Sequence, residues 1–449
     1  MEHNINADSF GTERIWKILL RIAPPVMLAQ LIQALYNVVD SYFIGKFSED
    51  GLTALSVIFP IQVLIIALAV GTGVGVNTLM ARMYAQDRES DAGRTAGVGI
   101  FLAVVTWAVF AILTALILRP FVMTSAKSPE AVEYAVSYGR IVCAGSLGIF
   151  LESCFSKIHQ AMGNMKLPML AQISGAVTNI ILDPILIFGV GKIPAMGVTG
   201  AAIATICGQF VAAVITGVSA ARRPPKLAKM SRYIRAIYHY GFPSIFMQVL
   251  YVVYIMILNI ILSGFSDAAV TVLGLYYKLQ SFFFIPLQAL ETCIVPVLSY
   301  NYARGRYDRC RSLIWNSVLL SMGFMLVGVF CFEIIPESLI GIFSESEAVL
   351  TAGVPAFRII GSSFIPATVA LLSPTIFQAI GEAHQSIILS LIRQVFCLIP
   401  IFWFFSNFGL VYTWIAFPMA EIITSTVGLC LYFKETRRWN VVGETKSID

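Results

Sequence analysis

The sequence has little charge. Only 12% of its 449 residues are Asp, Glu, Lys or Arg, whereas a soluble globular protein carries about 25%. The hydrophobic fraction is 58% and the mean hydropathy is +0.81. So few charged side chains cannot cover a water-soluble domain of this length. The composition therefore predicts an all-α membrane protein with many spans.

Motifs of the common enzyme and metal sites are absent from the sequence. The eight cysteines include no C-x-x-C pair, so neither a disulfide framework nor a zinc site is expected. There is no G-x-x-x-x-G-K-[ST], H-E-x-x-H or G-x-S-x-G motif. We therefore expect no enzyme activity, no ATP hydrolysis and no cofactor. The polar amino terminus also predicts that no signal peptide is cleaved.

Long apolar segments are what the sequence has instead. Twelve of them are long enough to cross a bilayer, which takes about 20 residues. They lie near residues 17–43, 53–80, 95–118, 132–156, 167–190, 196–220, 237–263, 270–300, 312–335, 352–377, 386–405 and 410–433. Each is predicted to be a helix, because only a helix satisfies its own backbone groups in lipid.

The basic residues lie in alternate loops. With twelve spans, 22 of the 30 Lys and Arg residues lie on the side of the two termini. The opposite side holds Lys46, Arg119, Lys127 and Lys192. The positive-inside rule then puts both termini in the cytoplasm of a cell whose inner membrane the chain spans. The basic stretch 222–236 is interpreted as a linker that contacts lipid headgroups, not nucleic acid.

The second half of the chain repeats the first at an offset of 218 residues. Pro25 aligns with Pro243, Gln30 with Gln248, and a Gln-Ala-x-Gly motif recurs from Gln378. Because the offset contains an even number of spans, the halves are predicted to be parallel six-helix repeats. We expect an N-lobe at 1–221, the linker at 222–236 and a C-lobe at 237–449. In such proteins the substrate site tends to lie between the repeats.

One polar stripe interrupts the first span. Gln30, Gln33, Asn37 and Asp40 fall within about 80° of each other on a helix. A carboxylate inside a membrane span usually faces a bundle interior or a watery cavity and marks an ion or substrate pathway. Gln30 keeps a Gln in the second half, whereas the other three align with Tyr251, Ile255 and Leu258. Their chemistry is thus predicted to be particular to the N-lobe.

A second one-lobed polar pair lies in the fifth span. Asn179 and Asp183 are four residues apart and share a helix face. Pro184 has no backbone donor and so frees the carbonyl of Ile180. Together with Asp40 these groups predict a pocket for H⁺ or Na⁺. The alternative is that both acids only tether helices through hydrogen bonds.

Several stretches resemble the multidrug and toxic compound extrusion (MATE) family, and most closely its bacterial DinF and MepA types. The resemblance covers nearly the whole chain. It is carried by YNVVDSYFIGKF at 36–47, ARMYAQ at 81–86, NIILDPILIFG at 179–189, GVTGAAIAT at 197–205 and the twin Gln-Ala-x-Gly sites. The resemblance implies two six-helix bundles arranged as a V, with a central cleft from which drugs are exported against an ion gradient.

The resemblance also implies an ion site. The family's first-lobe site corresponds to Asp40, Asn179, Asp183 and Thr205 in this chain. Other members, of the NorM type, place acids in the seventh and tenth spans. Residues 245–262 and 363–380 hold no Asp or Glu, which argues against that second-lobe site here.

The predicted substrates are lipophilic, often cationic small molecules. The protein is expected to be a monomer. Aromatic, Met and polar side chains suit such ligands. The cleft candidates are Gln33, Tyr36, Asn37, Tyr251, Met256, Tyr276, Lys278 and Glu291. Two alternatives stay open. One is a flippase for lipids or lipid-linked oligosaccharides, which would need a cationic cleft, and the other is a channel-like protein without ion coupling.

Overall fold

The computed structural model describes residues 8–125, 128–226, 229–344 and 346–445. The chain divides into two compact units. The first contains Pro24–Val249, and the second contains Gly11–Ala23 and the chain from Leu250 onward. Two long helices, α2 (Ile15–Phe47) and α9 (Met230–Ser263), therefore each have residues in both units. The predicted lobes 1–221 and 237–449 instead assign the start of α2 to the first lobe and the start of α9 from Ile237 onward to the second.

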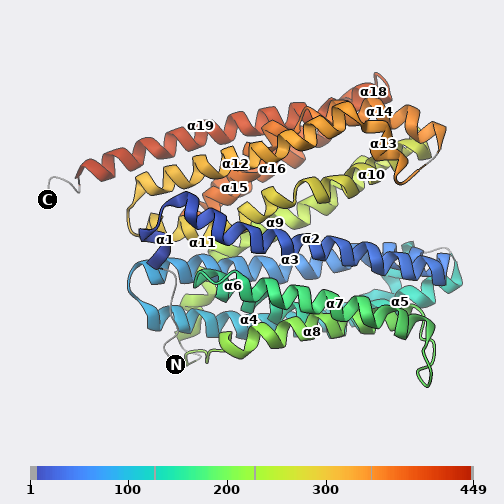
Figure 1. The fold of residues 1–449 in the computed structure, drawn as a ribbon, viewed down its shortest axis with the longest axis horizontal. Helices are drawn as coiled ribbons and strands as arrows, with labels where there is room; N and C mark the ends of the chain where they lie inside the picture. Colours follow the sequence, from blue (N-terminus) through green and yellow to red (C-terminus); the bar gives the residue numbers. More distant parts are fainter. Residues whose placement is uncertain (1–7, 126–127, 227–228, 345, 446–449) are drawn as a thin grey trace. The chain divides into compact units, whose positions relative to one another are not determined.

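Helices dominate the first unit (Figure 1). Besides most of α2 and the first part of α9, it contains α3 (Glu49–Ala85), α4 (Glu89–Ser125), α5 (Pro129–Gly145), α6 (Leu147–Ala161), α7 (Lys166–Phe188) and α8 (Val198–Ala220). A short helix, α1 (Asp8–Thr12), precedes α2. α5 and α6 meet at an angle of 41°, so together they form one bent span.

The second unit is also helical (Figure 1). Its helices after α9 are α10 (Asp267–Phe283), α11 (Ile285–Ala303), α12 (Tyr307–Ile334), α13 (Pro336–Gly341), α14 (Glu347–Gly361), α15 (Phe364–Ile380), α16 (Ala383–Leu391), α17 (Ile399–Ser406), α18 (Leu410–Thr413) and α19 (Ala416–Thr445). A π-helical segment, η2 (Ile392–Leu398), joins α16 to α17. The pairs α10–α11 and α14–α15 are bent by 53° and 58°.

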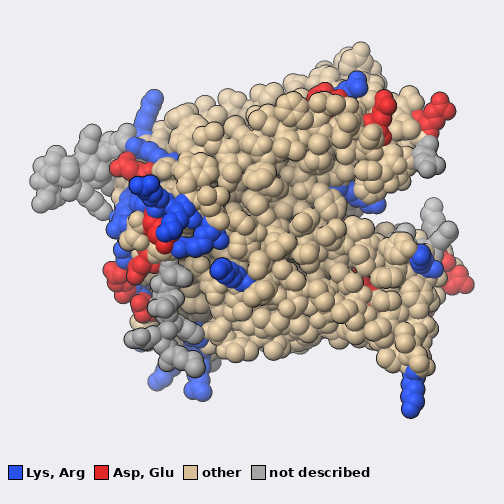
Figure 2. All heavy atoms as spheres, in the orientation of Figure 1, with Lys and Arg blue, Asp and Glu red and all other residues tan. Residues whose placement is uncertain are grey.

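The described helices agree with the predicted spans. Nine are long and apolar enough to cross a membrane, and each of the three bent pairs supplies one further span, which gives up to twelve. The surface in view shows why they suit a bilayer: in each unit, Lys, Arg, Asp and Glu gather near the helix ends and are sparse between them (Figure 2). The all-α, twelve-span fold is thus confirmed.

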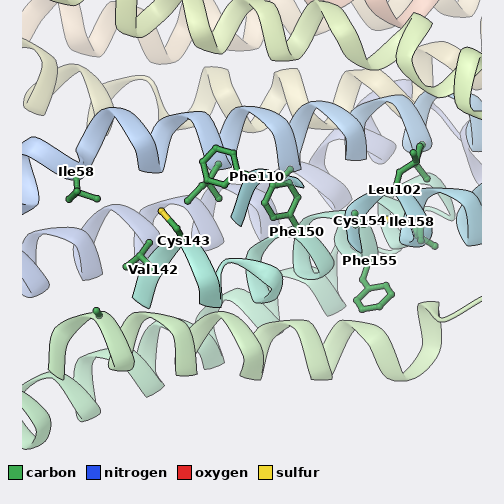
Figure 3. Close-up of a cluster of buried hydrophobic side chains, with 14 of the residues drawn as sticks. Ile58, Leu102, Phe110, Val142, Cys143, Phe150, Cys154, Phe155 and Ile158 are labelled. Carbon is green, nitrogen blue, oxygen red and sulfur yellow. The ribbon is translucent and has the colours of Figure 1, made fainter. Parts of the chain in front are cut away.

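The core of the first unit is built from apolar side chains of several helices. Phe110 of α4, Val142 of α5, and Phe150 and Ile158 of α6 are all buried, and they belong to one contiguous cluster (Figure 3). Lipid does not drive helices together as water does, so close packing of such side chains must hold the bundle.

Small residues bring α7 and α8 into close contact. A Cβ atom at Gly175 would lie 2.6 Å from the backbone oxygen of Gly208, and a Cβ at Gly208 would lie 2.6 Å from that of Gly175. Only glycine at both positions permits this approach. The contact sets the distance between Asn179 of α7 and the facing turns of α8.

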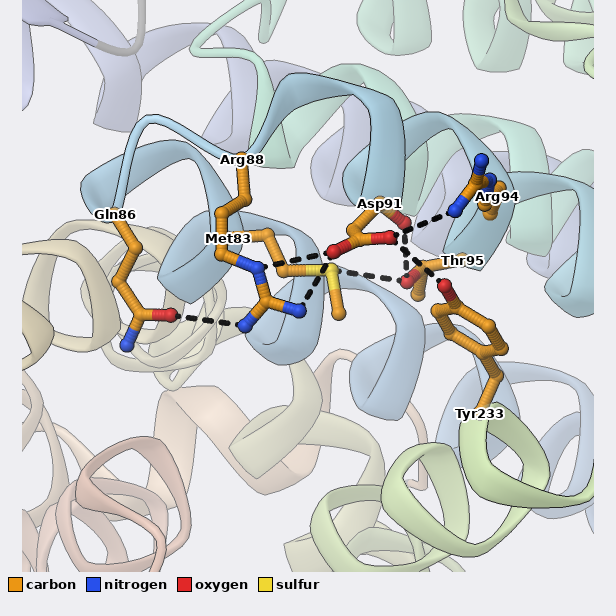
Figure 4. Close-up of polar contacts among 7 residues, drawn as sticks. All are labelled: Met83, Gln86, Arg88, Asp91, Arg94, Thr95 and Tyr233. Atoms are coloured by element: carbon orange, nitrogen blue, oxygen red, sulfur yellow. Dashed lines mark hydrogen bonds and ion pairs between the residues drawn. The ribbon is translucent and has the colours of Figure 1, made fainter. Parts of the chain in front are cut away.

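A polar cluster fixes the start of α9 in the first unit. The Asp91 carboxylate accepts hydrogen bonds from Arg88 (2.6 Å) and from the Tyr233 hydroxyl (2.9 Å), and it pairs with Arg94 (Figure 4). Thr95 donates to the backbone oxygen of Asp91. Tyr233 falls in the predicted basic linker, whose later part is thus the first turn of α9.

Candidate functional site

Asp40 lies near the end of α2 and points into the first unit. Its neighbours Gln33 and Asn37 are exposed, whereas Asp40 is only 8% exposed and Tyr36 is partly buried. Within the described chain, Oδ1 of Asp40 has no hydrogen-bond partner. A buried, unpartnered carboxylate oxygen costs free energy unless a proton or cation joins it. The side chains of the predicted polar stripe therefore lie in two environments: Asp40 is buried, whereas Gln33 and Asn37 are exposed.

Asn179 and Asp183 are one turn apart on α7, as their spacing predicted. Asp183 is fully buried and Asn179 is 2% exposed. The amide orientation that satisfies both of its ends has Nδ2 donating to Oδ2 of Asp183 at 3.2 Å, while Oδ1 accepts from the backbone N–H of Thr205 at 3.2 Å. Asn179 thus connects Asp183 to α8.

The four predicted ion ligands come together from three helices. Thr205 on α8 is 9% exposed and faces Asn179. The carboxyls of Asp40 and Asp183 are close enough to interact electrostatically. Neither forms an ion pair within the described part of the chain. The site therefore offers carboxylate, amide and hydroxyl oxygens with no cation of its own, a set that suits a proton or a hard cation.

Two further side chains around Asp40 were missed by the sequence reasoning. Tyr138 of α5 is 1% exposed, interacts electrostatically with Asp40 and accepts a hydrogen bond of 3.1 Å from Nε2 of Gln62. Gln62 aligns with Gln280, so this glutamine is shared by both halves of the repeat and does not distinguish the first. Tyr138 aligns with Ala356, and this loss of an aromatic hydroxyl was the signal that could have found it.

A third acid of the first unit approaches the same region. Glu152 of α6 is partly buried and accepts a hydrogen bond of 2.7 Å from the Ser156 hydroxyl. Gln172 of α7 donates to the same oxygen at 3.4 Å. Tyr36 interacts electrostatically with Asp40, Asp183 and Glu152.

The cleft candidates of the second half lie in different environments. Tyr251 and Met256 on α9 are 39% and 53% exposed. Tyr276 on α10 is buried and packs edge-on against Phe417. Lys278 is exposed, and its Nζ lies 5.8 Å from the centre of the Phe343 ring. Tyr251 and Tyr276 both pack against the Tyr277 ring, with centroid distances of 6.0 and 4.9 Å.

The second unit has a buried ion pair that the sequence did not reveal. Arg393, in η2, donates from Nη2 to Oε1 of Glu421 at 2.6 Å, and from Nε to both carboxylate oxygens at 3.0 Å. The two side chains are 10% and 7% exposed. Glu291 of α11 also interacts electrostatically with Arg393. Glu421 is therefore paired with a cation, unlike Asp40 and Asp183 of the first unit.

No metal cluster is evident in the described chain, because no group of three or more His, Cys, Asp or Glu side chains converges there. The first-unit site contains two aspartates with an amide and a hydroxyl, which is a ligand set for a monovalent ion or a proton. These residues do not form a catalytic arrangement of nucleophile and base.

Known proteins are similar to this chain in sequence and in fold. The multidrug export protein MepA of Staphylococcus saprophyticus is 21% identical over 94% of this chain and 95% of its own length. An FAD transporter of Shewanella oneidensis is 22% identical over 86% and 87%. Among solved structures, a MOP superfamily transporter from Pyrococcus furiosus has a TM-score of 0.89 at 23% identity, over 96% of this chain and 98% of that chain.

A family model describes most of the chain. The model, MatE, matches residues 25–185 and again residues 243–404. The second match begins 218 residues after the first, which is the offset of the internal repeat. A match of this extent shows the family, so the chain belongs to the MatE family of membrane transporters and is not an enzyme.

Proposed function

We propose that the chain is a secondary active multidrug efflux transporter that exports lipophilic, often cationic compounds in exchange for H⁺ or Na⁺. The observation that carries the proposal is the uncompensated pair of aspartates in the first unit. Asp40 and Asp183 are buried, interact with each other and have no cationic partner among the described residues. Buried acids of this kind in a membrane span mark ion pathways.

The ion drives transport only if it binds two conformations unequally. A shift from 1:99 to 99:1 between two states needs about 5.5 kcal/mol of differential binding. Neutralising two neighbouring buried carboxyls is an interaction of sufficient strength. In the proposed cycle, binding at Asp40, Asn179, Asp183 and Thr205 favours one side-facing state and drug binding favours the other.

The substrates are proposed from relatives and from the chemistry of the site. MepA is a multidrug export protein by name. When ionised, Asp40 and Asp183 make their surroundings negative, which favours cationic ligands over anionic ones. The cytoplasmic position of both termini, an inner membrane location and a monomeric state belong to the same proposal.

Transport by purified protein in proteoliposomes tests the coupling. Wild-type protein should accumulate ethidium when either a pH or a Na⁺ gradient is imposed, and Asp40→Asn and Asp183→Asn should lower the accumulation reached at steady state. Asp308→Asn makes the same change at a fully exposed carboxyl and should leave transport unchanged. Full accumulation by both intramembrane variants would overturn the proposal.

A flippase for lipids or lipid-linked oligosaccharides is the second candidate, and one similar protein is by name a transporter of FAD, which carries phosphate groups. Such a substrate calls for an available cationic group. Arg393 is engaged by Glu421, and the ligand set around Asp40 is acidic. Competition of ethidium transport by a pyrophosphate-linked lipid, with no effect of ion gradients, would favour this candidate.

A further inference from the structure

The three helices that carry the candidate ion site end a short distance beyond it. α2 ends seven residues after Asp40, α7 ends five residues after Asp183, and α8 begins seven residues before Thr205. These helix ends lie at the same end of the first unit, where the loop between α7 and α8 is also found (Figure 1). An ion that reaches the site from this end must therefore pass between them.

Buried apolar residues follow the site residues on the same helix faces. On each of α2, α7 and α8, one or two turns closer to this end, an apolar residue lies within about 40° of the site residue around the helix. These residues are Ile44, Ile187 and Val198. Their side chains are 0%, 0% and 1% exposed and belong to one contiguous apolar cluster. We refer to these three residues as the apolar layer.

Contacts between helices join the residues of the apolar layer. A Cβ atom at Gly51 of α3 would lie 2.9 Å from Cγ2 of Val198 and 3.3 Å from Cγ2 of Ile44. These two side chains therefore meet at the same turn of α3. The backbone N–H of Gly197 donates to the backbone oxygen of Ile187 at 3.1 Å, which fixes the start of α8 to the last turn of α7. The layer thus includes all three helices that carry the site residues.

The Phe47 ring lies against the start of α8, next to Val198. A Cβ atom at Gly197 would lie 2.5 Å from Cζ of Phe47, and Gly197 has a φ of 56°. Glycine therefore permits both the backbone turn and the position of the ring. The ring also packs edge-on against Tyr134 and Phe188, with centroid distances of 6.4 Å. Phe47 thus connects the end of α2 with α5, α7 and α8.

The internal repeat contains the same phenylalanine in a different setting. At the offset of 218, Phe47 aligns with Phe265, whereas Tyr134 aligns with Ala352. Phe265 is 38% exposed and has no ring contact within the described chain. The second unit therefore keeps the phenylalanine without the ring packing. The packed ring belongs to the unit that also has the buried aspartates.

A packed layer of hydrocarbon side chains is a barrier to ions. An ion inside it would lose its water without gaining a polar partner, which costs far more than thermal energy. Apolar constrictions in channels block ions in this way, by excluding water. Carboxylate, amide and hydroxyl groups lie on the inner side of the layer, at Asp40, Asn179, Asp183 and Thr205. An ion can therefore bind there, but it cannot cross the layer while the side chains stay packed.

We propose that Phe47 and the apolar layer form a gate between the candidate ion site and the side of the membrane opposite to the chain termini. This inference rests on the proposed function, and it holds for either coupling ion. The gate is closed in this structure. Because an ion from that side reaches the site only when the gate opens, the gradient is not dissipated while the transporter carries no drug.

Ion leak through purified protein in proteoliposomes tests the gate. Without ethidium, Phe47→Ala and Val198→Ala should dissipate an imposed pH or Na⁺ gradient about tenfold faster than wild-type protein, because smaller side chains admit water and lower the barrier. A pH-sensitive or Na⁺-sensitive dye inside the vesicles measures the rate. The matched control is Phe265→Ala, the same change at the equivalent position of the second unit, which should leak at the wild-type rate.

A combined variant shows whether the leak passes through the candidate ion site. Adding Asp40→Asn and Asp183→Asn to Phe47→Ala should remove the leak, whereas a leak caused by damaged packing would remain. Phe47→Leu keeps a bulky apolar side chain and should hold the gradient nearly as well as wild-type protein. Melting curves in detergent verify that each variant is folded.

The outcomes separate the gate from the proposed function. Wild-type leak rates in both Phe47→Ala and Val198→Ala, an equal leak in Phe265→Ala, or a leak that persists without the two aspartates would each overturn the gate. Full gradient-driven accumulation of ethidium by Asp40→Asn and Asp183→Asn would instead overturn the proposed function.

Discussion

The two units treat buried charge in opposite ways. In the first unit Asp40 and Asp183 are buried and form no ion pair in the described chain, whereas in the second unit Glu421 is held by Arg393 through hydrogen bonds of 2.6 and 3.0 Å. The same family model matches residues 25–185 and 243–404, so the helices that the two halves share do not require either arrangement. A repeat can keep its packing and place ion chemistry in one copy only.

The backbone also differs between equivalent spans of the two halves. The second span is one continuous helix, α3, whereas its counterpart is broken and bent by 53° between α10 and α11. The eleventh span contains the π-helical segment that carries Arg393, while the fifth span, α7, is α-helical throughout. π-helical turns often occur at functional or strained positions. Here the segment presents Arg393 toward Glu421.

The largest expected effect is on the buried ion pair. Arg393→Met leaves Glu421 as an unpaired charge inside the second unit and should destabilise the protein by about 3–5 kcal/mol. Thermal unfolding of purified protein in detergent measures this loss. The double variant Arg393→Met with Glu421→Met should regain most of the stability, and a double variant as unstable as the single one would contradict the charge-pair explanation.

The glycine contact of the first unit should give a smaller effect. Ala at position 175 would place Cβ 2.6 Å from the backbone oxygen of Gly208, so Gly175→Ala should cost about 1–3 kcal/mol. The control in the second unit is Gly274→Ala, because nothing lies within 4 Å of a Cβ there. Equal melting temperatures for the two variants would show that α7 and α8 can accommodate a methyl group at position 175 without loss of stability.

A single hydrogen bond fixes α9 to the start of α4. Tyr233→Phe removes the donor to Asp91 and should cost about 1 kcal/mol. Arg88 and Arg94 continue to bind Asp91 in this variant, so folding should persist. The melting temperature measures the loss, and a much larger decrease would mean that Tyr233 does more than donate this bond.

The smallest stability effect is expected at the proposed ion site. Asp183→Asn removes a buried charge that has no cationic partner, so its free energy of unfolding should change by less than about 1 kcal/mol or increase. Glu421→Gln, the same kind of change in the second unit, leaves Arg393 unpaired and should destabilise strongly. Melting curves of the two variants sharpen the comparison, and equal losses would remove the distinction between the units.

Sequence reasoning predicted the parts of the site that lie close together along the chain. Asn179 and Asp183 were paired from their spacing, and Thr205 was assigned by resemblance to the family. The structure places these three residues together. Tyr138 and Gln62 were missed because they come from other helices, and no helical period in either segment indicates which side chain it will meet.

The ion pair shows the same limit over a longer distance. Arg393 and Glu421 are 28 residues apart and lie on different elements. In the sequence, Arg393 falls in the predicted span 386–405 and Glu421 in the next one, 410–433, and no motif joins them. Their pairing depends on how η2 and α19 are rotated against each other, which local spacing does not encode.

The sequence by itself determined the membrane class, the twelve spans and the repeat, because the transfer of apolar side chains into lipid depends on composition and length alone. Tertiary structure alone decided which polar groups meet. It placed Asn179 between Asp183 and the backbone N–H of Thr205, and it paired Arg393 with Glu421. Helix rotation and close packing set these partners, and those depend on all the neighbouring helices at once.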